Sequence, residues 1–148
     1  MHMKNLDGND NMEEQTDKDI QAIAKIISLT RTNKIEWSSV DSKSIPRKGS
    51  EDIIDSAYVS QYKEKIIRLY RRKYKGHSIT SKIGVLAFGA SVKQSEMRWY
   101  SEVILDITNR NGTSLWEFPK EDILNDLLKT IKYKTSGAED LIEGLLNE

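Results

Sequence analysis

Basic and aromatic residues alternate between positions 68 and 74, in the order Arg, Tyr, Arg, Tyr. Residues two apart lie on the same face of a β-strand, so this spacing gathers two guanidinium groups and two rings on one face. Guanidinium groups bind phosphates and aromatic rings stack on bases, which would suit nucleic acid; the same face could instead contact a protein. With the basic turn that follows, the candidate partner-binding residues are Arg68, Tyr70, Arg72, Tyr74, Lys75 and His77.

A purely structural interpretation of this face stays open. Arg68 and Arg72 are four residues apart, as are Glu102 and Asp106 on a later predicted strand. If the two strands are antiparallel neighbours, the arginines pair with the carboxylates across the sheet. Exposed pairs of this kind contribute only about 0–1 kcal/mol each, which fits a solvated ladder of charges.

Charge is unevenly distributed along the chain, although 23 basic and 23 acidic residues cancel overall. Residues 61–100 hold ten Lys or Arg and two acids, a local charge of +8, against −4 for residues 1–20 and −5 for residues 101–148. Such segregation favours electrostatic steering and docking of a specific partner.

Few residue combinations that catalyse reactions are present. The chain has no cysteine and only two histidines, which excludes thiolate and multi-histidine metal sites. The segment Gly84–Ser91 has the glycine spacing of a phosphate-binding loop, but Ala90 stands where that loop needs lysine. Glu102 and Asp106 would lie ~13 Å apart along a strand, too far for a hydrolytic carboxylate pair. His77 has no nucleophile or orienting acid nearby in the sequence. We therefore expect no enzyme, no cofactor and no metal.

The 148 residues predict one domain over residues 16–148, preceded by a polar, disordered tail over residues 1–15. No run of 18 apolar residues occurs, so we expect no membrane partner. The lack of cysteine and of a signal-like segment predicts a cytoplasmic location.

The order of elements predicts an α+β fold, with an N-terminal helix, an antiparallel sheet of about five strands, and two C-terminal helices packed on one face. Apolar residues at helical spacing predict the first helix over residues 17–30, and Pro119 is expected at the first position of the second. Ser136 and Glu139 predict a capping box for the last helix. Trp37, Trp99 and Trp116 are expected as core anchors. The predicted strands are residues 34–39, 57–61, 66–74, 97–108 and 114–118, with a loop over residues 41–56 and a hairpin turn over residues 63–65.

Several stretches of the chain form a distinctive set, of which the clearest is the Trp-Glu-Phe-Pro run over residues 116–119, followed by leucine-rich C-terminal helices. Together these stretches resemble a widespread family of small, uncharacterised bacterial α+β proteins. The resemblance covers roughly residues 20–146 and implies a bacterial, soluble, single-domain protein. It transfers no functional residue. The stretches that carry it are Ile27–Thr30, Ile35–Trp37, Tyr58–Tyr62, Ile67–Tyr70, Leu105–Ile107, Asn111–Gly112, Leu115–Pro119, Leu124–Leu128 and Gly137–Leu146.

Missing catalytic chemistry and segregated charge together favour a small bacterial protein-interaction module, such as an immunity, antitoxin or defence-accessory protein. The alternative is a nucleic-acid-binding module that uses the basic and aromatic strand face. A homodimer through a sheet edge or an apolar patch is also open.

Overall fold

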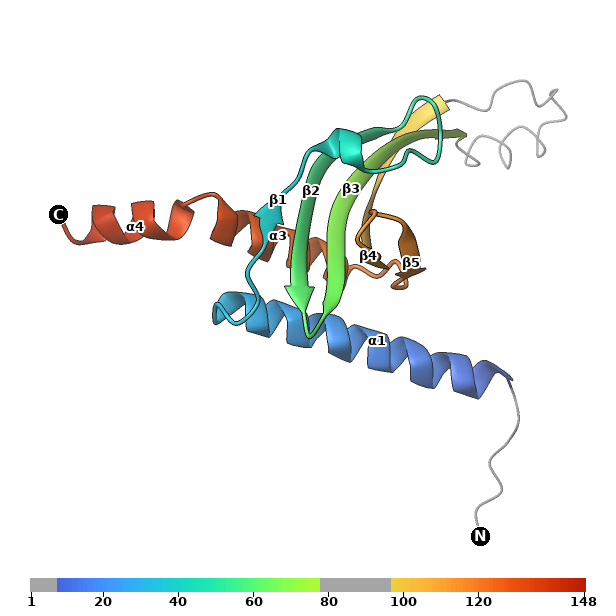
Figure 1. The fold of residues 1–148 in the computed structure, drawn as a ribbon, viewed down its shortest axis with the longest axis horizontal. Helices are drawn as coiled ribbons and strands as arrows, with labels where there is room; N and C mark the ends of the chain where they lie inside the picture. The colour runs from blue at the N-terminus through green and yellow to red at the C-terminus, as the bar shows by residue number, and fades with distance from the viewer. Residues whose placement is uncertain (1–7, 78–96) are drawn as a thin grey trace, which may run out of the picture.

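The computed structural model describes residues 8–77 and 97–148. A five-stranded antiparallel sheet in the order β1-β2-β3-β4-β5 combines with helices from both ends of the chain, which confirms the predicted α+β fold (Figure 1). The elements are α1 (Gly8–Arg31), β1 (Ser38–Ser39), the 3-10 helix η1 (Ser42–Ser44), β2 (Ile53–Tyr62), β3 (Lys65–His77), β4 (Met97–Thr108), β5 (Ser114–Glu117), α3 (Ile123–Thr135) and α4 (Ala138–Leu146).

The main core lies between one face of the sheet and the helices α1 and α3. Ile23 and Ile27 of α1 are four residues apart, so both point to the sheet from the same side of the helix. The indole of Trp37 is buried beside them and donates a hydrogen bond of 3.0 Å to Thr30 Oγ1, so its N–H is satisfied. The sheet and α3 complete the core with Ile67, Leu69, Val103, Leu105, Leu124, Leu127, Leu128 and Ile131.

A second, smaller core lies on the opposite face of the sheet. The segment between β1 and β2 was expected to be a plain loop, but it folds over this face and buries Ile45. A register shift in β2 between Ile54 and Ser56 lets Ile54 and Ala57 point to the same side despite their odd spacing. Tyr70 and Ile104 complete this second core. The outer face of the sheet is therefore partly covered.

The central strands agree with those predicted from the sequence, whereas the ends of several other elements differ from the predicted bounds. The bounds of β4 are those predicted, and β2 and β3 meet at the expected hairpin turn after Tyr62. The helix α1 begins at Gly8, so residues 8–15 are helical where a disordered tail was expected. The strand predicted over residues 34–39 is reduced to β1, because residues 34–37 carry Ile35 and Trp37 into the main core.

The two C-terminal helices, expected together on one face of the sheet, differ in their packing. The helix α3 begins at Ile123, four residues after Pro119, so the proline lies outside it. The predicted capping box is wrong, because Ser136 accepts a hydrogen bond from the Ala138 N–H and Glu139 pairs with Lys134. Within the described residues, four residues of α3 are buried and none of α4 is buried.

The helices in residues 8–77 and 97–148 include none that is long and apolar enough to cross a membrane. The glycine-spaced segment Gly84–Ser91 lies outside the described residues.

Candidate functional site

The register of β3 and β4 places the predicted charge pairs opposite each other. Arg68 is the Cα partner of Asp106, and Arg72 is the Cα partner of Glu102. Both pairs form salt bridges, so the cross-strand ladder predicted from the matched spacing is confirmed.

The first of these pairs is buried, which corrects the expectation of a solvated ladder. Arg68 Nε and Nη2 donate to the two carboxylate oxygens of Asp106 at 3.1 and 2.6 Å. Arg68 Nη1 donates to the carbonyl oxygen of Gly112 at 2.9 Å, in the turn before β5. Both residues of the pair are buried, which the sequence spacing alone does not reveal.

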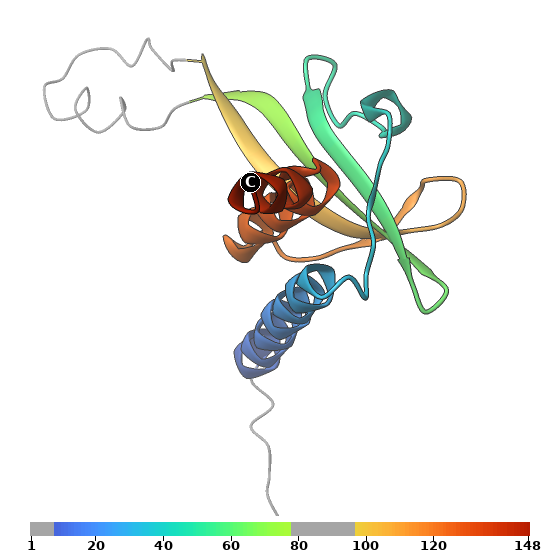
Figure 2. The ribbon, with the colours of Figure 1, turned by 90° about the vertical axis from the view of Figure 1, so that its left-hand side faces the viewer.

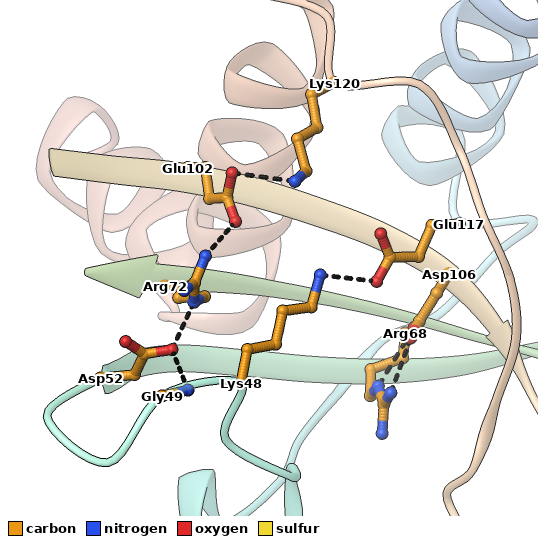
Figure 3. Close-up of polar contacts among 9 residues, drawn as sticks. All are labelled: Lys48, Gly49, Asp52, Arg68, Arg72, Glu102, Asp106, Glu117 and Lys120. Carbon is orange, nitrogen blue, oxygen red and sulfur yellow. Dashed lines mark hydrogen bonds and ion pairs between the residues drawn. The ribbon is translucent and has the colours of Figure 1, made fainter. Parts of the chain in front are cut away.

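Arg72 occupies the centre of a larger network that Figure 3 shows. Its guanidinium group donates to Asp52 on one side and to Glu102, at 2.7 Å, on the other. Glu102 also pairs with Lys120 at 3.0 Å, and Asp52 accepts the backbone N–H of Gly49 at 2.9 Å. The network therefore fastens the segment before β2, and the segment after β5, to the middle of the sheet.

The network keeps its carboxyl groups ionised. The hydrogen bond from Arg72 is the main reason why the pKa of Asp52 is below its ordinary value. Burial raises the pKa of Glu102, but hydrogen bonds from Arg72 and Lys120 outweigh it and the pKa is lowered. A general acid at neutral pH needs the opposite direction, so these shifts suit ion pairing.

Tyr70 is also buried, directly beside this network. The Arg68 guanidinium lies over its ring, 5.3 Å from the centroid. Burial, followed by the negative charge of Asp106, raises the pKa of Tyr70 to about 12. Arg68 and Tyr70 were predicted to contact a partner, but the structure places both inside the protein.

The remaining predicted residues lie where β3 and β4 reach past the other strands as a two-stranded ribbon (Figures 1 and 2). Tyr74 stacks on Tyr100 with ring centroids 5.7 Å apart, and the Arg72 guanidinium lies 4.4 Å from the Tyr74 ring centroid. Lys75 alternates to the opposite face and lies 5.2 Å from the ring centroid of Trp99. His77, the last residue of β3, is exposed on the same face as Lys75.

Three exposed residues at this end of β4 were missed in the sequence: Met97 and Trp99 on the face of Lys75, and Tyr100 on the face of Tyr74. Trp99 was expected in the core, but 51% of it is exposed; Trp116 is also exposed, and only Trp37 is buried as predicted. The sequence could have placed Trp99 beside the predicted residues, because the register that pairs Arg72 with Glu102 also places Trp99 opposite Lys75. We call the exposed residues on the Trp99 face of the ribbon, Lys75, His77, Met97 and Trp99, the ribbon surface.

No family model, curated protein or solved structure matches this chain. Among the described residues there is no group of three His, Asp or Glu side chains that could hold a metal ion.

Proposed function

We propose that this protein is a non-enzymatic protein-interaction module and that the ribbon surface binds its partner. The observation that carries the proposal is Trp99, which is large, half exposed and held by Lys75 on a paired β-ribbon. Tryptophan, tyrosine and methionine are enriched at protein interfaces, and a few such residues supply most of the binding energy.

The ribbon holds these side chains in place before a partner arrives. On the opposite face of the ribbon, Tyr74 and Tyr100 stack on each other, which ties together the two strands that carry Lys75 and Trp99. The guanidinium group of Arg72, itself paired with Asp52 and Glu102, packs on the Tyr74 ring. Side chains that are already ordered lose less conformational entropy on binding, so more of their contact energy appears as affinity.

The charges near this surface favour a protein over nucleic acid. Arg71 and Lys73 both pair with Asp55, and Lys75 pairs with Glu51 at 3.4 Å. Carboxylates beside these cations reduce the positive potential that attracts phosphates. The partner we expect is a cytoplasmic protein of the same bacterium, as for an immunity, antitoxin or defence-accessory protein.

The experiment is affinity capture of partners by the full chain, followed by titration of the purified partner against variants. Trp99→Ala should lower the affinity by about 30-fold or more, the loss typical of a central interface residue. Trp116→Ala is the matched control, because Trp116 is exposed on β5 and should bind as the wild type does. Unfolding curves of both variants establish that the fold is kept.

Three results would contradict the proposal. One is that no protein is recovered in stoichiometric amounts. A second is that a partner binds Trp99→Ala and the wild type with equal affinity, which would show that the ribbon surface is not its binding site. The third is that oligonucleotides bind the wild type with steep salt dependence and lose affinity in Trp99→Ala, which assigns the same surface to nucleic acid.

A further inference from the structure

The helix α4 exposes an apolar stripe. Four large side chains lie on one side of this nine-residue helix, and between 43% and 79% of each is exposed. Figure 1 shows α4 leading away from the sheet, with the C-terminus at its far end. Contiguous exposed apolar residues mark interaction surfaces, among them surfaces that bind another protein chain. The stripe consists of Leu141, Ile142, Leu145 and Leu146.

The charges around this stripe restrict what covers it. Glu139, Asp140 and Glu143 are acidic, and α4 contains no lysine or arginine. Two α4 helices packed side by side would bring like charges together, which disfavours their direct pairing. The covering surface should therefore combine apolar contact area with positive charge.

The chain itself carries a surface of this kind. A groove of about 580 Å³ lies where the C-terminal end of α1 meets α3. Arg31, Lys129 and Lys134 supply positive charge, and the exposed ring of Tyr133 supplies apolar area. Two carboxylates, Asp126 and Glu139, also line the groove, and Glu139 is already paired with Lys134 at 2.9 Å.

The geometry points to a two-fold dimer in which the stripe of each α4 packs on the groove of the other copy. One helix of nine residues, about 14 Å long, is too short to bury the ~800 Å² per partner of a standard interface. Reciprocal docking supplies two helix contacts, and it closes the assembly at two copies. The ribbon surface remains outside this interface, because Figure 1 shows the ends of β3 and β4 that carry it and the helix α4 on opposite sides of the view.

Light scattering and sedimentation equilibrium on the full chain test the dimer. The wild type should be a dimer, and Leu145→Asp should be a folded monomer. Leu115→Asp is the matched control, because Leu115 on β5 is exposed to nearly the same extent, 62% against 63%. That control should remain a dimer. A wild type that is monomeric at its highest soluble concentration overturns the inference, as does a dimer that Leu115→Asp disrupts and Leu145→Asp does not.

Charge reversal tests whether the groove is the partner of α4. Glu143→Lys and Lys129→Glu should each weaken dimerisation by about tenfold, and combining them should restore part of the loss. High salt should weaken the wild-type dimer. A dimer that needs Leu145 but ignores Lys129→Glu would show that α4 packs elsewhere, and would overturn the reciprocal arrangement.

Discussion

Arg68 and Asp106 are opposite each other on β3 and β4, and their side chains form a bidentate salt bridge inside the protein. The side chain of Arg68 is 6% exposed and that of Asp106 is 0% exposed. Taking two charges out of water is costly, and the pair is tolerated because each group satisfies the other. The carbonyl of Gly112 accepts a third hydrogen bond from the same guanidinium. Removing one partner should therefore be far worse than removing both.

We expect Arg68→Met to lower the free energy of unfolding by about 3–5 kcal/mol, because it leaves the carboxylate of Asp106 buried without its partner. The double variant with Asp106→Leu should recover most of this loss, since no buried charge remains. Urea unfolding followed by circular dichroism measures both changes.

The control for that experiment is an exposed ion pair between β5 and the segment before β2. Lys48 and Glu117 are 3.0 Å apart, with side chains 42% and 32% exposed, so Lys48→Met should cost at most about 1 kcal/mol. Equal losses for Lys48→Met and Arg68→Met would contradict the distinction between the two pairs.

Acid should destabilise the protein through the network around Arg72. The pKa values of Asp52 and Glu102 are lower in the folded protein than their ordinary values of 3.8 and 4.5, so unfolding takes up protons. Their contribution to stability is complete above these ordinary values and is lost as the pH falls through 4.5 and 3.8 towards the folded-state pKa values. Urea unfolding across this range measures the loss. Arg72→Met should be less stable than the wild type at neutral pH, and its free energy of unfolding should fall less steeply as the pH is lowered. If the free energy of unfolding falls with pH in parallel for the two proteins, the network does not cause the acid sensitivity.

Alkali should destabilise the protein through Tyr70. Its pKa is raised to about 12 from 10.0, mainly by burial, so the folded protein disfavours the tyrosinate. The contribution of Tyr70 is complete below pH 10.0 and is lost as the pH rises to about 12. Ultraviolet titration of the phenolate should show one late transition that is absent in Tyr70→Phe. If Tyr70→Phe instead removes a transition near pH 10, the ring is not buried in solution.

Alternation and spacing were sufficient to predict the centre of the fold. Val103 and Leu105 point to the main core, with Ile104 and Asp106 on the other face, and this period of two gave the bounds of β4. The matched four-residue spacing of the charges then gave the register with β3. These are local patterns, and they are found in the structure because each face of these strands packs against its own core.

What could not be predicted depends on contacts between distant segments. The buried environment of Arg68 includes the turn at Gly112, 44 residues away in the sequence, and no local pattern encodes this contact. Trp99 shares a face with Val103, but four residues place it about 13 Å further along the strand, beyond the buried core. The apolar stripe of α4 has the pattern of a packed helix, and the sequence does not say whether its neighbour is the same chain or another copy.

The turn before β5 should be sensitive to a single methyl group at Gly112. This glycine has a φ of +82°, in the left-handed region that other residues adopt only at a cost of about 1–2 kcal/mol. Its carbonyl also accepts the hydrogen bond from Arg68, so the turn and the buried salt bridge are coupled. We expect Gly112→Ala to lower the free energy of unfolding by at least ~1 kcal/mol and Gly112→Asn to cost less, because asparagine tolerates this conformation. Urea unfolding of the two variants measures both free energies of unfolding. If alanine is no worse than asparagine, the left-handed backbone does not limit stability at this turn.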